Sequence, residues 1–183
     1  MNEAVIAMDQ SAFTQLYEEH ADYALRCAAA ITQNKVLAAD AVQETFIRVY
    51  RHFASYDQAK PFKPWLYRIL VNECRRIIKG NNTTITIDEY RERSIHPSEK
   101  DHYSFQEYEQ LYASIQRLSD IYRMPIILKS LNDFSEKEIG DIMELNVNTV
   151  KSRLLKGRTK LRCFLETIEE RRIGDGEAHE ESP

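Results

Sequence analysis

The stretch "FSEKEIGDIMELNVNTVKSRLLKGRTKLR", residues 134–162, decides the fold of the C-terminal half of this 183-residue chain. Ser135 and Glu138 have the spacing of a capping box, in which each side chain accepts a hydrogen bond from the other residue's backbone N–H, so a short helix is predicted to begin at Ser135. We expect that helix to end by Met143 and, after a tight turn, a longer helix to run from Val147 to Ile168. A short helix, a tight turn and a second helix form helix-turn-helix geometry.

The apolar side chains of this stretch recur at helical spacing and can form one small shared core: Ile139, Ile142, Val147, Val150 and Leu154. Between residues 147 and 164 the second helix carries six Lys or Arg and no Asp or Glu, although the whole chain has a formal net charge of −4. On a helical wheel, cations and short hydrogen-bonding side chains share the face opposite the apolar stripe; they are Thr149, Ser152, Arg153, Lys156 and Lys160.

That mixture of side chains suits the major groove of duplex DNA. Lys and Arg neutralise phosphates, and Thr, Ser, Arg and Lys side chains can reach base edges, whereas a carboxylate on the same face would be repelled. The sequence therefore predicts that this helix binds DNA. Two alternatives remain: a solvated basic helix that complements its own C-terminal dipole, and a helix-turn-helix look-alike that binds protein.

Five more helices are predicted from apolar residues at helical spacing. Their expected bounds are 12–31, 36–53, 65–79, 105–118 and 120–131. Pro64 is expected at the very start of the helix predicted at 65–79, where its missing N–H costs nothing. Pro125 is expected to start or kink the helix that contains it.

The fold class that follows is all-α, with two small helical domains joined by a flexible linker. The first domain spans residues 11–80, and the second, with the helix-turn-helix, spans residues 105–170. The polar stretch 81–104 between them lacks a sustained apolar period and is predicted to be the linker; "TTITI" within it could form a short strand, but would have no partner. The acidic segment 171–183 is predicted to be a disordered tail.

Several classes of protein are disfavoured by what the chain lacks. No apolar run approaches the roughly 18–20 residues that span a bilayer, and the N-terminus does not resemble a signal peptide, so a cytoplasmic location is expected. Cys27, Cys74 and Cys163 lack metal-ligand or redox spacing, and neither an HExxH pattern nor a Gly-rich phosphate loop occurs. We therefore expect no bound metal, no cofactor and no enzyme activity.

Three segments resemble those of bacterial sigma factors of the extracytoplasmic-function (ECF) type, in the sigma-70 family of RNA polymerase subunits. "LAADAVQETFIRVYRHF" (37–53) resembles the helix that grips the clamp helices of RNA polymerase. "KPFKPWLYRILVNECRRIIK" (60–79) resembles the segment that melts the minus-ten promoter element. The stretch 134–162 resembles the helix-turn-helix that reads the minus-thirty-five element. The resemblance covers both domains, from about residue 13 to residue 165.

The first of these segments has a polar face. Asp40, Gln43 and Glu44 lie on it at i, i+3 and i+4 spacing. Two carboxylates there repel each other unless a cationic partner neutralises them. A solvated helix face would account for the spacing too, and a metal site would need further ligands. The resemblance implies that the partner is a basic-lined coiled coil of the largest polymerase subunit, contacted by Asp40, Gln43, Glu44 and Phe46.

The second segment alternates aromatic and cationic side chains, which suits unstacked single-stranded DNA because cations hold the backbone while rings stack on bases. The predicted minus-ten contacts are Lys60, Phe62, Lys63, Trp65, Arg68, Asn72, Arg75 and Arg76. Much of the aromatic content, Trp65 included, could instead belong to the core, so Phe62, Lys63 and Asn72 are favoured as direct contacts. The resemblance implies that residues 56–63 cup a flipped base above Asn72.

For the minus-thirty-five element, the resemblance points to Lys151, Ser152, Leu155 and Lys156. The helical wheel shares only Ser152 and Lys156 with that set, so these two residues are the most strongly predicted DNA contacts.

Three positions depart from the family pattern. Glu144 stands where the turn usually has Gly, so a left-handed backbone there would be strained. Arg76 replaces the Asp often found four residues after Asn72, and Pro125 replaces an ordinary helix former. These departures bear on local geometry and on the promoter sequence that is read.

The hypothesis that results is an alternative sigma factor that binds core RNA polymerase, recognises the minus-thirty-five and minus-ten elements and promotes DNA melting without chemistry of its own. The implied partners are core RNA polymerase, promoter DNA and an anti-sigma factor that could be membrane-anchored, with no small-molecule substrate. The alternative is a stand-alone helix-turn-helix transcription regulator whose N-terminal domain senses a ligand or a protein, and a helical adaptor that binds only proteins is a further rival. The basic-aromatic segment 60–79 favours the sigma factor, because a duplex reader does not need it.

Overall fold

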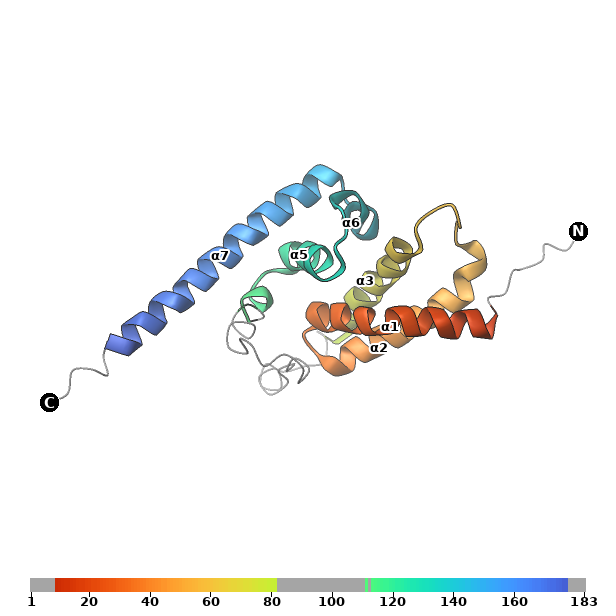
Figure 1. Cartoon of the computed structure of the whole chain (residues 1–183), viewed down its shortest axis with the longest axis horizontal. Helices are drawn as coiled ribbons and strands as arrows, with labels where there is room; N and C mark the ends of the chain where they lie inside the picture. The colour runs from red at the N-terminus through yellow and green to blue at the C-terminus, as the bar shows by residue number, and fades with distance from the viewer. Residues whose placement is uncertain (1–8, 82–110, 112, 178–183) are drawn as a thin grey trace, which may run out of the picture.

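The computed structural model describes residues 9–81, 111 and 113–177, and all regular structure within these ranges is helical. In chain order the elements are α1 (Gln10–Thr32), α2 (Lys35–His52), the 3-10 turn η1 (Phe53–Ser55), α3 (Phe62–Asn81), α5 (Asp120–Asn132), α6 (Glu136–Met143) and α7 (Val147–Glu177) (Figure 1). The all-α prediction is confirmed. The predicted linker beyond residue 81, the possible strand at 83–87 and most of the helix predicted at 105–118 lie outside the described residues.

Helices α1, α2 and α3 pack together as the first domain. Gln33 adopts a left-handed conformation that ends α1, and the side chain of Asn34 then accepts hydrogen bonds from the backbone N–H groups of Val36 and Leu37, which starts α2. Helix α3 begins at Phe62 rather than at the predicted proline. Pro64 lies in the first turn instead, where backbone N–H groups have no acceptor within the helix, so its ring costs no hydrogen bond.

The predicted helix-turn-helix is present as α6 and the first half of α7. The hydroxyl of Ser135 accepts from the N–H of Glu138 at 3.2 Å, and the Glu138 carboxylate accepts from the N–H of Ser135 at 2.8 Å. Hydrogen bonds from the Ser135 hydroxyl and backbone hold the pKa of Glu138 below its usual value. Glu144 then turns the chain with φ 58° and ψ 46°, in the left-handed region that the sequence predicted to be strained. The side chain of Asn146 accepts from the N–H of Asn148 and starts α7.

Two close approaches in the second domain require glycine. A Cβ atom on Gly140 would lie 2.8 Å from the carbonyl oxygen of Leu145, which would block the turn of the helix-turn-helix. A Cβ atom on Gly157 would lie 2.6 Å from Cδ1 of Ile126, so glycine lets α7 settle directly on α5. Pro125 lies inside α5 and does not start it, because the helix already begins at Asp120.

Helix α7 is longer than expected and runs to Glu177. Residues 171–177, which were predicted to belong to the disordered tail, are therefore helical, whereas residues 178–183 lie outside the described part of the chain. Once a helix is nucleated, each added residue gains a hydrogen bond for the ordering of one residue, so Gly174 and Gly176 do not by themselves end it.

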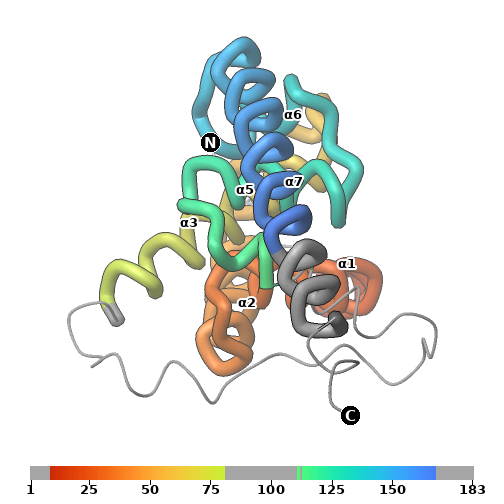
Figure 2. Tube along the Cα trace, turned by 90° about the vertical axis from the view of Figure 1, so that its left-hand side faces the viewer, coloured from red at the N-terminus to blue at the C-terminus, as the bar shows by residue number. Residues whose placement is uncertain are grey.

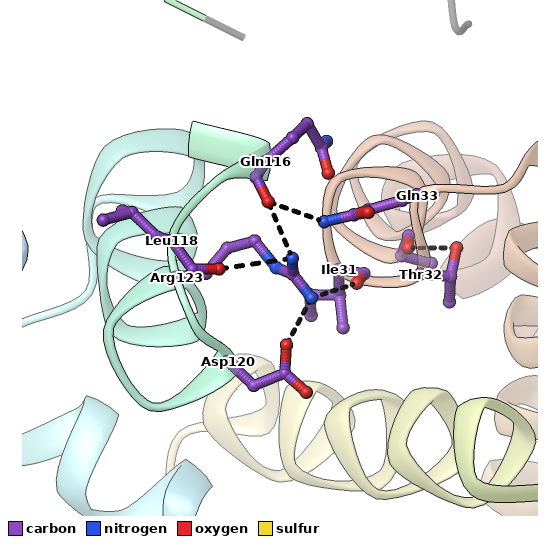
Figure 3. A network of polar contacts seen from close by, with 8 residues as sticks. Ile31, Thr32, Gln33, Gln116, Leu118, Asp120 and Arg123 are labelled. Carbon is purple, nitrogen blue, oxygen red and sulfur yellow. Dashed lines mark hydrogen bonds and ion pairs between the residues drawn. The ribbon is translucent and has the colours of Figure 1, made fainter. Parts of the chain in front are cut away.

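The two domains pack against each other, with α6 on α3 and α5 on α1 (Figures 1 and 2). Phe134, just before α6, is buried and meets the ring of Tyr67 in α3 edge to face, with centroids 5.1 Å apart. At the other contact, the buried guanidinium of Arg123 donates to the carbonyl oxygen of Ile31 at the end of α1 (Figure 3). It also donates to the carbonyl oxygens of Gln116 and Leu118 and pairs with Asp120.

Candidate nucleic-acid and polymerase interfaces

The N-terminal half of α7 presents an exposed basic face opposite its buried stripe. Val150, Leu154, Gly157 and Leu161 are buried against the rest of the second domain. Among the residues that the side opposite this stripe exposes are Lys151, Ser152, Leu155 and Lys156. Leu155 is 68% exposed in the middle of these polar side chains, where an apolar group is suited to contact a thymine methyl. We call these four residues the α7 face.

The other residues that the helical wheel selected lie to one side of the α7 face. Thr149 and Arg153 are half-buried, and the ammonium of Lys160 lies 5.8 Å from the centre of the Tyr122 ring. The helical wheel included these residues in the exposed face because Gly157 has no apolar side chain. The hydrophobic pattern therefore does not reveal that the side of α7 with Gly157 packs on α5. The residues indicated by the family resemblance are thus the more exposed set.

The loop before α3 is held by a cluster of aromatic rings. Tyr56 lies 4.8 Å from Trp65 and 5.6 Å from Phe62, centroid to centroid, and its hydroxyl donates to the carbonyl oxygen of Lys60. Phe62 and Trp65 are half-buried by these contacts, whereas Lys60 is exposed. The cluster therefore fixes the loop 56–63 and still exposes part of two rings, as stacking on an unpaired base would require.

The remaining predicted minus-ten residues follow α3. Arg68, Asn72 and Arg76 are exposed, and Arg75 is half-buried. A hollow of about 240 Å³ lies between α2 and α3, and its lining includes Asn72 together with Trp65, Ile69, Arg48, His52 and Glu73. Sequence reasoning predicted Asn72 and Trp65 at such a site but missed Arg48 and Glu73.

The missed pair belongs to an ion triad. Arg48 and Glu73 lie on different helices, so only the tertiary structure brings them together. The spacing of Glu73 and Arg76, at i and i+3 of one helix, was the one signal that the sequence offered.

Two of the predicted minus-ten residues are engaged by the second domain. The Lys63 ammonium donates to the carbonyl oxygen of Asn132 at 3.1 Å and lies 5.1 Å from the centre of the Phe134 ring. Arg68 pairs with Glu144 in the turn of the helix-turn-helix. In this arrangement of the domains, the two side chains serve the contact between α3 and the second domain.

The predicted polymerase-binding residues lie on α2. Asp40 and Gln43 are exposed and Glu44 is half-buried, so the polar face of α2 is accessible. Phe46 is only 2% exposed and packs edge to face against Tyr17, with centroids 4.8 Å apart. Phe46 therefore belongs to the core and also lines the base of the neighbouring groove, and its role as a polymerase contact stays a prediction.

An apolar groove of about 540 Å³ runs beside that polar face, between α1 and α2. Tyr17 and Leu25 of α1 line it together with Val42, Gln43 and Ile47 of α2. Tyr17 and Leu25 are large apolar residues that remain more than two-fifths exposed, at 45% and 42%. Helical spacing predicted the helix that contains Tyr17 but missed this surface, because periodicity does not tell how far an apolar stripe is covered.

Within the described part of the chain, no helix is long and apolar enough to cross a membrane. The described residues also include no group of three or more His, Cys, Asp or Glu arranged to hold a metal ion. Burial raises the pKa of the Cys27 thiol to about 12 and also raises that of Cys74. Cys163 is exposed on α7.

Comparisons with known proteins match both domains. Residues 16–84 match the family model described as Sigma-70 region 2, and residues 108–161 match Sigma-70, region 4. The chain is 30% identical to the ECF RNA polymerase sigma factor SigW of Bacillus subtilis, over 87% of this chain and 92% of that protein. It is 32% identical to the ECF RNA polymerase sigma factor SigE of Mycolicibacterium smegmatis, over 86% of this chain and 64% of that protein.

Solved structures agree with these sequence matches. The sigma factor RpoE of Bartonella quintana, in complex with the anti-sigma factor NepR, matches with a TM-score of 0.70 at 25% identity, over 84% of this chain and 96% of that one. CnrH in complex with the cytosolic domain of CnrY shares the fold, with a TM-score of 0.66 at 24% identity, over 87% and 90% of the two chains. With a region 2 and a region 4 in this order, the chain belongs to the ECF RNA polymerase sigma factors, which are alternative sigma factors that act with RNA polymerase.

Proposed function

We propose that this sigma factor recruits core RNA polymerase to promoters by placing the α7 face in the major groove of the minus-thirty-five element. The observation that carries the proposal is the composition of that face. Two lysines, a serine and an exposed leucine stand opposite the buried stripe, and no Asp or Glu occurs between residues 147 and 164. Lysine and serine can donate to base edges or phosphates, and the leucine can contact a thymine methyl.

The loop 56–63 and α3 then hold the minus-ten element as the duplex opens. The partly exposed rings of Phe62 and Trp65 provide stacking surfaces, and Asn72 offers an amide beside the hollow between α2 and α3. Lys60 and Arg75 add positive charge for the backbone of the unpaired strand. Melting follows because binding to unpaired bases stabilises the open form of the duplex.

Core polymerase is bound through α2 and the groove beside it. Asp40, Gln43 and Glu44 supply a polar, acidic face, and Tyr17 and Leu25 supply apolar area at its edge. Apolar anchors beside a charged rim are the usual composition of a protein interface. A basic-lined coiled coil of the polymerase fits this combination.

Binding both promoter elements requires the two domains to separate. Their names place the elements about 25 base pairs apart, which is roughly 85 Å of duplex at 3.4 Å per pair. In this structure α6 rests on α3, so the two domains lie too close together to bind the two elements at the same time. The chain between residues 81 and 111 is long enough to span that distance at about 3.3 Å per residue. Lys63 and Arg68 would be released for DNA by the same separation.

An anti-sigma factor belongs among the proposed partners, because the sigma factor RpoE of Bartonella quintana was solved in complex with one and aligns with 84% of this chain. We place the protein in the cytoplasm, where core polymerase acts. It supplies binding energy and positioning and performs no covalent chemistry.

Run-off transcription tests the proposal. Purified core polymerase is mixed with genomic fragments, with and without this protein, and the start sites are mapped. We expect discrete transcripts only when the protein is present, from sites that lose activity when either promoter element is changed. If the protein caused no initiation on any of the fragments tested, the proposal would be contradicted. Tight binding of the free protein to the same fragments, without polymerase, would instead indicate a stand-alone regulator.

A further inference from the structure

Glu73 of α3 is a buried carboxylate held between two arginines. Its Oε1 atom lies 2.6 Å from Nε of Arg48 in α2, and its Oε2 atom lies 2.7 Å from Nε of Arg76 one turn further along α3. The side chain of Glu73 is 5% exposed, whereas those of the arginines are 45% and 55% exposed. The triad thus has an anionic centre inside the domain and two cationic groups at its surface.

The charges of this triad do not balance. One arginine would suffice to neutralise Glu73 in its buried position, so the second adds a positive charge to the triad, which the more distant Glu44 carboxylate of α2 partly offsets. Both ion pairs use Nε, and among the described residues no hydrogen bond involves the terminal amino groups of either arginine. These groups are the ones that bind phosphate oxygens in a forked, bidentate manner.

The triad lies where an unpaired strand is proposed to bind. Arg48 and Glu73 line the hollow of about 240 Å³ that also contains Asn72 and Trp65. This volume is smaller than that of pockets for drug-sized molecules and suits one planar group. A base held beside Asn72 would bring its own phosphates to the rim of the hollow, within the neighbourhood of the two guanidinium groups.

We propose that Glu73 is a positioning residue that holds Arg48 and Arg76 as a binding site for a backbone phosphate of the unpaired strand. The inference rests on the proposed function and deepens it, because it adds Arg48, from the helix predicted to bind polymerase, to the DNA contacts. Because both guanidinium groups are fixed before DNA binds, less side-chain entropy is lost on binding. It also gives Arg76 a defined role at a position where the family often has Asp.

The alternative is that the triad only ties α2 to α3. The two interpretations differ in sign for Glu73→Gln. This change removes a negative charge beside the proposed DNA path, so electrostatics alone predicts unchanged or tighter binding of an anionic strand. Loss of positioning predicts weaker binding, although the surface has become more positive.

The test measures binding of the reconstituted holoenzyme to a fluorescent single-stranded oligonucleotide with the non-template minus-ten sequence of a mapped promoter. Anisotropy titrations at several salt concentrations give the affinity and its salt dependence. We expect Arg48→Ala to weaken binding about tenfold, the usual effect of losing a hydrogen bond to a charged group. The slope of log K against log salt should fall by about 0.7, which corresponds to one phosphate contact on a single strand. Glu73→Gln should weaken binding several-fold at every salt concentration.

Matched controls separate binding from folding. Arg51→Ala removes the same charge from an exposed site one turn along α2, and should change the affinity less than twofold. Arg48→Lys keeps the charge but loses the fork, and should recover only part of the affinity. Thermal unfolding of each free variant identifies any loss of fold, and oligonucleotides with one neutral methylphosphonate at a time locate the contact. At one linkage the substitution should weaken the wild type but have no further effect on Arg48→Ala.

Equal or tighter binding by Glu73→Gln, with the fold intact, would overturn the proposal, as would the same response of wild type and Arg48→Ala to the methylphosphonate at every linkage. Those results would leave the proposed function standing. If the wild-type holoenzyme does not bind the strand at all, the proposed function fails and this site fails with it.

Discussion

Arg68 of α3 and Glu144 of the helix-turn-helix form an ion pair, although they are 76 residues apart and belong to different domains. Glu144 occupies a left-handed turn position, with φ 58°, that favours glycine. Its side chain pairs with Arg68, a predicted minus-ten residue, so a residue in a left-handed turn of the second domain contacts the DNA-binding surface predicted for the first. Both side chains are largely exposed, and such pairs contribute at most about 1 kcal/mol.

Strain at Glu144 should appear in the stability of the protein once the ion pair is removed. In a background of Arg68→Ala, we expect Glu144→Gly to raise the free energy of unfolding by about 1 kcal/mol, because glycine adopts the left-handed conformation without a Cβ clash. Urea unfolding measures the difference. In the wild-type background the gain should be smaller by the contribution of the pair. A destabilised Glu144→Gly variant in the Arg68→Ala background would show that the turn is not strained.

Arg123 should contribute more to stability than any exposed pair. Its buried guanidinium joins α5 to the end of α1 and has carbonyl and carboxylate acceptors on several sides. We expect Arg123→Ala to destabilise the protein by about 3 kcal/mol, because it leaves buried acceptors without their donor. Urea unfolding gives the magnitude, and hydrogen exchange should show faster opening near Ile31. As a control, Arg51→Ala, which removes an exposed arginine of α2, should have little effect.

The three cysteines should differ sharply in reactivity. Burial keeps Cys27 and Cys74 as neutral thiols, with the pKa of Cys27 raised to about 12, whereas Cys163 is exposed. Since the thiolate is the reactive form, iodoacetamide at pH 8 should alkylate only Cys163 in the native protein. All three should react in urea, as peptide mass spectrometry can show. Labelling of Cys27 or Cys74 at the rate of Cys163 would contradict the packing of the first domain.

Two alanine substitutions test whether DNA is bound by the α7 face or by the half-buried residues beside it. We expect Lys156→Ala to weaken holoenzyme binding to a promoter duplex about tenfold, the typical effect of losing a base or phosphate contact. The salt slope should fall by about 0.9 if the contact is to phosphate. Arg153→Ala, on the half-buried side, should change the affinity by less than threefold. Equal losses from both would mean that the helix enters the groove with the orientation given by the wheel.

Charge reversal on α2 tests the polymerase interface. Glu44→Arg should weaken capture of core polymerase about tenfold, because it puts a cation against a basic partner. Glu18→Arg, an equal change of charge on an exposed part of α1, is the control and should retain capture. Unaltered capture by Glu44→Arg would place the interface elsewhere, with the apolar groove around Tyr17 and Leu25 the next surface to test.

The family resemblance pointed to Glu144 as the position of a left-handed turn. The sequence alone was sufficient to predict most of the described helices and the capping box at Ser135. These features depend on residues within one or two helical turns of each other, so the letters next to them contain the information. The same locality explains the errors. The start of α3 was predicted at Pro64, although the helix begins at Phe62, and the end of α7 was predicted too early. Both errors arise because the limits of a helix depend on weak terminal preferences.

Only the tertiary structure decided which side of α7 is exposed, that Phe46 is core, and that Arg48 joins Glu73 and Arg76. Each of these depends on contacts between helices that are distant in the chain. Hydrophobic periodicity tells that a helix has a buried side but not how deeply a neighbour covers it, and a glycine such as Gly157 gives no apolar signal at all. The pairing of Arg68 with Glu144 belongs to the same class, because it exists only while α6 lies on α3.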